Sequence, residues 1–298
     1  MWARIWGSRG SLAAPGPDTV RYGGNTSCVE VRTSDGEVIV LDAGTGMRAL
    51  GIQLDGEGVQ RVHVLLSHLH MDHVQGLGFF RPLFRDDVEV HLWGPPSTVQ
   101  PLDERIAMYL SPPLFPVSLS EIPSRIVFHD ATDEQFVIGD ATVTATNVAH
   151  QGPTVGYRIE EPGGAIAYIP DHEPAIGVDL RSLGPSWISG HALAHDVDVL
   201  LHDSQYSEDE YPNHVGWGHC SIEHVVTFAE LAAVRRLVLF HHDPLHTDDD
   251  LERLCARARQ LWRGTGAEPE LAYEGMQIDL SSRETAGHEE KVWDHSKV

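Results

Sequence analysis

The sequence predicts an α/β protein, an αββα sandwich in which two mixed β-sheets are flanked by helices. Two strand-rich halves, each closing with helices, favour this arrangement. Polar clusters also recur where apolar runs end, and a rigid scaffold commonly presents its chemical groups at such places. These clusters are residues 67–73, His150, Asp171, Asp203 and His241.

The first half of the chain reads as short strands separated by turns. Two apolar runs in residues 28–44 flank Asp35-Gly36, which is a strong hairpin signal. Residues 61–67 and 87–95 are further expected strands, and residues 74–84 are the expected start of a helix. The proline-rich residues 96–125 are interpreted as an irregular flap or short helices near a pocket mouth.

In the second half, strands and helices alternate. The expected strands lie in residues 136–150, 154–161, 165–171, 196–206 and 235–242, and the expected helices in residues 221–234 and 247–262. Thr247 and the acidic residues after it are typical of a helix N-terminus. No repeat or linker divides the chain, so we expect one domain over residues 1–280 and a flexible tail over residues 281–298.

Composition narrows the functional classes. The 298 residues are 41% hydrophobic, enough for a full core, and carry a formal charge of −23. So acidic a surface repels phosphate backbones at long range. The three cysteines, Cys28, Cys220 and Cys255, lack CxxC spacing and are expected to be reduced thiols in a cytoplasmic protein. The start is too short and polar for a secretory signal, and no apolar run approaches the ~18 residues of a membrane span.

Residues 64–80, VLLSHLHMDHVQGLGFF, contain the pattern H-x-H-x-D-H directly after an apolar run. An extended backbone puts His68 and His70 on one side, and the turn into a helix would bring Asp72 and His73 to a neighbouring point. Imidazole and carboxylate are ligands for Zn²⁺, Mn²⁺ or Fe, and two sets so close suit two ions. A solvated histidine-rich loop is the alternative, but this cluster caps an apolar strand.

Here the chain resembles the metallo-β-lactamase fold hydrolases, because SHLHMDH at residues 67–73 looks like their signature. The later positions follow in the family's order, with His150 in NVAHQG, Asp171 in AYIPD and His241 in LVLFHHDP. The resemblance implies one ion on His68, His70 and His150, another on Asp72, His73 and His241, and Asp171 bridging both. Adjacent residues of an extended strand point in opposite directions, and His241 is expected to be the ligand instead of His242. His172 stands where relatives often have a small hydroxyl residue.

Further positions are similar to the tRNase Z and phosphodiesterase branch of this superfamily. Asp203 follows a strand, and His219 lies in a Gly-His motif in which Cys220-Ser221 replaces the usual Ser-Thr. A histidine held by a carboxylate can donate a proton to a departing alkoxide, so Asp203 and His219 are expected to be catalytic together with Asp72. The alternative is that His219 only caps the following helix.

The N-terminal stretch, residues 6–28, resembles the start of a bacterial subgroup of this superfamily. Its glycines and Arg9 are expected to form a loop near the metals. Arg9 could hold a phosphate oxygen or be a surface arginine in a turn. Asp42 is expected to orient the ligand histidines from behind.

We therefore expect a dinuclear metal-dependent hydrolase, a phosphodiesterase that cleaves a small phosphodiester or cyclic nucleotide through a metal-bridging hydroxide. Two divalent ions are expected, zinc first, with Mn or Fe also suited. A thioester or lactone hydrolase on the same metal site is the alternative, and a non-catalytic metal-binding protein is the third reading.

As partners we expect a small-molecule ester and no membrane, with a homodimer possible. Neither tRNA nor other nucleic acid is expected as a substrate. The net charge argues against it, and only twenty residues separate His150 from Asp171, where tRNA-processing relatives insert a flexible arm.

Overall fold

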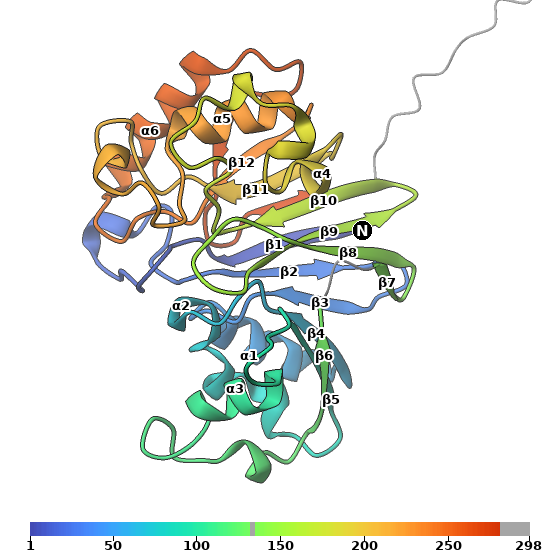
Figure 1. The fold of residues 1–298 in the computed structure, drawn as a ribbon. Helices are drawn as coiled ribbons and strands as arrows, with labels where there is room; N and C mark the ends of the chain where they lie inside the picture. Colours follow the sequence, from blue (N-terminus) through green and yellow to red (C-terminus); the bar gives the residue numbers. More distant parts are fainter. Residues whose placement is uncertain (132–134, 281–298) are drawn as a thin grey trace, which may run out of the picture.

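The computed structural model describes residues 1–131 and 135–280. Two seven-stranded sheets pack face to face, and helices cover the outer side of each (Figure 1). The predicted α/β sandwich of two mixed sheets is thus confirmed. The predicted tail, residues 281–298, lies outside the described residues.

The first sheet has the order β14-β1-β2-β3-β4-β5-β6 and the second the order β13-β12-β11-β10-β9-β8-β7. The strands are β1 (Trp2–Gly7), β2 (Cys28–Arg32), β3 (Val38–Leu41), β4 (Arg61–Leu65), β5 (Glu89–Gly94), β6 (Arg125–Asp130), β7 (Gln135–Ile138), β8 (Ala141–Asn147), β9 (Val155–Glu161), β10 (Gly164–Ile169), β11 (Val199–Asp203), β12 (Leu237–Phe240), β13 (Glu270–Leu271) and β14 (Gln277–Asp279). The α-helices are α1 (Met47–Glu57), α2 (Met71–Val74), α3 (Leu102–Tyr109), α4 (His191–Ala194), α5 (Ile222–Leu231) and α6 (Asp248–Leu261). Short 3-10 helices are η1 (Pro17–Thr19), η2 (Leu77–Phe79), η3 (Arg81–Phe84), η4 (Leu119–Glu121), η5 (Leu180–Ser182), η6 (Pro185–Trp187) and η7 (Tyr211–Asn213).

Each sheet is antiparallel on one side and parallel on the other. In the first sheet β3 pairs with β2 in the predicted antiparallel hairpin, whereas β3, β4, β5 and β6 run parallel. In the second sheet β10, β11, β12 and β13 run parallel, and β7 to β10 form antiparallel pairs. The carboxyl ends of parallel strands share one edge, so the residues that follow β4, β10, β11 and β12 gather at the rim of the sandwich, near α2 (Figure 1).

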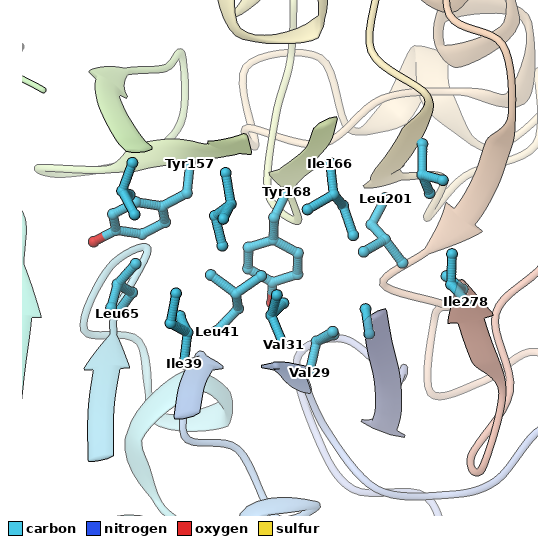
Figure 2. Packing of buried hydrophobic residues seen from close by; sticks show 14 of the residues in the cluster. Val29, Val31, Ile39, Leu41, Leu65, Tyr157, Ile166, Tyr168, Leu201 and Ile278 are labelled. Atoms are coloured by element: carbon cyan, nitrogen blue, oxygen red, sulfur yellow. The ribbon is translucent and has the colours of Figure 1, made fainter. Parts of the chain in front are cut away.

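Three apolar clusters hold these layers together. The central cluster lies between the sheets, where Val31 and Leu41 of the first sheet meet Ile166 and Tyr168 of the second (Figure 2). A second cluster packs α5 and α6 on the second sheet, and a third packs α1 and α3 on the first. Alternation explains why one strand serves two clusters, since Val29 faces the other sheet while its strand neighbour Cys28 faces the helices.

Two predicted elements differ from the observed ones. The helix expected within residues 74–84 begins earlier, as the single turn of α2, and continues as the 3-10 helices η2 and η3. The expected flap of residues 96–125 contains α3 and η4, and its apolar side chains Leu102 and Ile106 pack on the first sheet. The α6 start is as expected, because Thr247 and Asp250 form a reciprocal capping box. No helix in the described part of the chain is long and apolar enough to cross a lipid bilayer.

Candidate metal centre

The end of β4 delivers the histidine-rich motif to the rim. Ser67 is anchored there, because its backbone N–H and its hydroxyl donate to the two oxygens of Asp42 at 2.7 and 2.8 Å. The backbone is extended at His70 and turns into α2 at Met71. His68 and His70 therefore precede the turn, while Asp72 and His73 follow it, which divides the motif as the sequence predicts.

His68, His70 and His150 form the first group of ligand-type side chains. His150 Nε2 lies 3.3 Å from His70 Nδ1, and the ring of His68 lies 4.8 Å from that of His150. The Nδ1 of His150 donates to the Gly218 carbonyl at 2.7 Å, which leaves Nε2 free to face the group. Burial lowers the pKa of all three imidazoles, which favours the neutral form that binds metals.

Asp72, His73 and His241 form the second group, and all three are buried. Asp72 Oδ2 lies 3.0 Å from His73 Nε2 and 3.3 Å from His241 Nε2. Burial opposes the charged form of Asp72, but His73 and His241 together hold the pKa of this carboxyl below its usual range. A carboxylate and two ring nitrogens thus converge on one point.

Asp171 follows β10 and lies between the two groups. Its Oδ2 faces the first group, at 3.7 Å from His68 Nε2 and 3.6 Å from His150 Nε2. Its Oδ1 faces the second, at 3.0 Å from His73 Nε2 and 3.2 Å from His241 Nε2. Each oxygen of one carboxylate is therefore directed to a different set of nitrogens.

The donors present fit divalent metal ions. Imidazole nitrogens and carboxylate oxygens are the ligands that zinc, manganese and iron accept. His68 Nε2 and Asp171 Oδ1 are both buried in this cluster, and neither has a hydrogen-bond partner among the described residues. Buried polar atoms are almost always paired, so these two mark places where an ion would complete the structure.

Buried side chains behind the cluster orient its rings. Asp42 Oδ2 accepts from His73 Nδ1 at 2.7 Å and from the Tyr168 hydroxyl at 2.7 Å, so Asp42 orients a ring of the cluster as predicted. Gln205 Oε1 accepts from His241 Nδ1 at 3.1 Å. In both cases Nε2 is left to face the centre.

The N-terminal loop closes the rim beside the second group. The Ser11 N–H donates to Asp72 Oδ2 at 2.7 Å. A Cβ on Gly10 would lie 2.3 Å from His241 Nδ1, so only glycine permits this approach. The loop is near the cluster, as predicted.

Asp203 and His219 lie against the same cluster. Asp203 is the last residue of β11, and its Oδ2 accepts from His219 Nδ1 at 2.6 Å. The His219 ring lies 5.0 Å from that of His150 and 5.1 Å from that of His241. Although burial alone would lower it, the Asp203 carboxylate raises the pKa of His219 to about 9. Ser221, not His219, caps α5 through its side chain.

Sequence reasoning missed Glu173, a buried carboxylate two residues after Asp171. It accepts from the Tyr211 hydroxyl at 2.6 Å and from the backbone N–H groups of Gly216 and Gly218 at 3.0 Å. The loop that it holds supplies the Gly218 carbonyl to His150 and then continues into His219. The sequence signalled this residue only by placing a carboxylate two positions after Asp171.

The structure shows the positions of three residues whose roles the sequence left open. Arg9 is fully buried and donates to the carbonyls of Gly23, Asp243 and His246, so it is neither a surface arginine nor a phosphate ligand at the rim. His241 lies in the cluster, whereas His242 Nε2 donates to the Ala272 carbonyl at 3.0 Å. His172 is directed away from the cluster, with Nδ1 2.8 Å from His202 Nε2.

Comparisons with known proteins find similarity over most of the chain. The family model described as the beta-lactamase superfamily domain matches residues 37–242. Ribonuclease Z of Myxococcus xanthus (strain DK1622) is 25% identical over 290 residues, which cover 83% of this chain and 90% of that protein. The metallo-beta-lactamase fold protein YhfI from Bacillus subtilis has a TM-score of 0.66 at 17% identity, with 93% of this chain and 98% of that one covered. The short form of human tRNase Z has a TM-score of 0.60 at 21% identity, with 94% and 99% covered.

These relatives correct one expectation. The inference that tRNA and other nucleic acids are not substrates is wrong, because curated relatives over most of the chain are ribonucleases Z and a human tRNase Z shares the fold. The net charge did not predict this correctly. Salt screens the long-range electrostatic field of the surface within about 8–10 Å, so positive side chains near the site decide whether a phosphate can approach. The hairpin of β9 and β10 does occupy the interval from His150 to Asp171, but a missing insertion there does not exclude RNA.

Proposed function

Since the chain belongs to the beta-lactamase superfamily, we propose that this hydrolase is a dinuclear, metal-dependent phosphodiesterase. His68, His70 and His150 would hold one ion and Asp72, His73 and His241 the other, with Asp171 contacting both. The split of the Asp171 oxygens between the two groups supports this assignment. Zinc is the first metal to test, and manganese and iron suit the same donors.

The pairing of His219 with Asp203 is the observation that favours phosphodiester hydrolysis over thioester or lactone hydrolysis. A phosphodiester with an ordinary alcohol as its leaving group needs a proton on the departing oxygen, whereas a thiolate or enolate leaves without one. The hydrogen bond of 2.6 Å fixes the tautomer with Nδ1 protonated toward Asp203 and directs Nε2 away from it. A histidine so held, beside the cluster, is suited to deliver that proton.

Divalent ions at this centre would supply positive charge on the phosphoryl oxygens and lower the pKa of water from 15.7 to about 7. The residues of the chain do the rest. The oxygen of water forms a bond to phosphorus and its proton passes to Asp72. The bond from phosphorus to the leaving oxygen breaks, and His219, an imidazolium that Asp203 stabilises, gives that oxygen a proton and becomes neutral. One water is consumed, and a phosphomonoester and an alcohol are released.

The name of the Myxococcus relative supports an RNA phosphodiester as the first substrate to test. Small diesters and cyclic nucleotides contain the same bond and remain part of the proposal. Both kinds of substrate require the same centre, so the class of reaction can be tested before the identity of the substrate is known.

The test compares three substrate classes on metal-analysed protein. A precursor tRNA with a 3′ extension, an unactivated dinucleoside monophosphate and a thioester are incubated with the same preparation. Cleavage of either diester well above the thioester rate supports the proposal. Turnover of the thioester alone would contradict it and assign acyl chemistry to the centre.

A further inference from the structure

A hollow of about 220 Å³ adjoins the first group of histidines. Its walls include His68, His70, Ser97 and Arg105. Arg105 belongs to α3, and the other three follow β4 or β5, which are parallel neighbours in the first sheet. Arg105 therefore lies at the same rim of the sandwich as the metal centre. It belongs to the proline-rich segment, residues 96–125, in which the sequence shows no recognisable motif.

The position of Arg105 is fixed by packing. Leu102 and Ile106 of α3 are buried against the first sheet. A Cβ on Gly94, at the end of β5, would lie 2.9 Å from the Leu102 side chain, so the helix sits directly on the strand end. One guanidinium nitrogen, Nη2, donates to the Pro95 carbonyl at 2.6 Å. The side chain is thus held in place, not free to swing into solvent.

Among the residues that the structure describes, no carboxylate forms an ion pair with Arg105. Its Nε is buried and has no hydrogen-bond partner among the described residues. Its protein acceptor is a carbonyl, whereas other arginines of this acidic chain, such as Arg21 and Arg32, form ion pairs with carboxylates. Burial lowers the pKa of Arg105, and the exposed Asp130 offsets this only in part. A partly buried cation without a counter-charge is costly unless an anion completes it.

We propose that Arg105, assisted by the Ser97 hydroxyl, binds a second phosphate group of the substrate in the hollow beside His68 and His70. This inference rests on the proposed phosphodiesterase function and names a property of its substrate. The cleaved phosphate lies at the metal centre, and the second is an anionic neighbour that is not cleaved. A guanidinium is the side chain best matched to phosphate oxygens, because its planar donors form charge-assisted hydrogen bonds with them. The phosphate could belong to the next nucleotide of an RNA or to a small phosphorylated diester.

The experiment measures kcat/KM for a dinucleoside monophosphate without a terminal phosphate and for the same compound carrying a 5′- or a 3′-phosphate. The metal-loaded wild-type protein is expected to prefer one phosphorylated form. In Arg105→Gln this preference should fall by roughly 10- to 100-fold, mostly through KM, and Arg105→Lys should retain part of it. Arg48→Gln, at an exposed arginine of α1, is the matched control and should keep the wild-type preference.

Three results would overturn the inference. Wild-type protein that cleaves all the dinucleotides equally well has no second phosphate site. An Arg105→Gln variant that loses the same factor on every dinucleotide has lost folding or general binding, and its thermal midpoint would show which. Absence of any diester cleavage by wild-type protein would remove the proposed function and this inference with it. A short RNA is assayed in parallel with the phosphorylated dinucleotides to distinguish the two sources of the phosphate. Only a site that binds RNA should show a further rise in kcat/KM as the chain becomes longer.

Discussion

Oδ1 of Asp171 lies 3.0 Å from Nε2 of His73, while Oδ2 of the same carboxylate faces His68 and His150. One side chain thus joins the two groups of donors. Asp171 is the first residue after β10 whose side chain reaches the cluster, and it is buried.

Asp171→Ala should lose both ions or the one in the second group, because the remaining donors are left without their shared carboxylate. Metal content after dialysis, measured by mass spectrometry, checks this. Asp86→Ala removes an exposed carboxylate and serves as the control. Full occupancy in Asp171→Ala together with wild-type turnover would show that Asp171 does not bridge.

His241→Ala and His242→Ala should have opposite effects although the residues are adjacent. His241 faces Asp72 and Asp171, so its loss should leave roughly one ion in place of two. His242 is bonded to the Ala272 carbonyl, so its loss should cost about 1–3 kcal/mol of the free energy of unfolding and leave the metal content intact. Metal analysis and urea denaturation separate the two effects. The reverse pattern would transfer the ligand role to His242.

His219→Ala should lower kcat for an unactivated dinucleotide by about 10²–10⁴-fold, because the departing alkoxide then leaves without its proton. A p-nitrophenyl diester, whose leaving group needs no proton, should lose much less. His195→Ala, at an exposed histidine, is the control. Equal losses on both substrates would assign His219 a structural role.

Glu173→Gln should weaken binding of the ion in the first group by about 10–100-fold, the usual effect of losing a partner that orients a ligand. An amide has one acceptor oxygen where the carboxylate accepts from Tyr211, Gly216 and Gly218, so the loop that fixes His150 loosens. Zinc affinity is measured by competition with a chelator. Glu223→Gln, at an exposed glutamate, should bind metal as the wild type does. Unchanged affinity in Glu173→Gln would limit its role to stability.

Much of the fold was predictable because its signals are local. The Asp35-Gly36 turn, the Thr247 capping box and the apolar runs of β10 to β12 each depend on residues close in sequence. The pairing of β1 with β14 was not predicted, since it joins the beginning of the chain to residues almost 280 positions later. The shortness of α2, which ends at Val74 and is followed by the 3-10 helix η2, was not predicted either.

The candidate site likewise has parts that the sequence predicts and parts that depend on contacts distant in sequence. The order of His68, His70, Asp72 and His73 predicted their convergence, because the strand end and the turn are local. Arg9 was misread, since its burial depends on carbonyl groups more than 230 positions away. The sequence alone could not show that Arg105 lacks an ion-pair partner among the described residues, because tertiary structure decides which carboxylates an arginine meets.

The most direct test of the account is anomalous diffraction from crystals grown with zinc or manganese. We expect two peaks roughly 3.5–4 Å apart, one beside His68, His70 and His150 and the other beside Asp72, His73 and His241, with Asp171 contacting both. A single peak on the first group, with Asp171 bound to one ion only, would contradict the dinuclear centre from which the proposed reaction is derived.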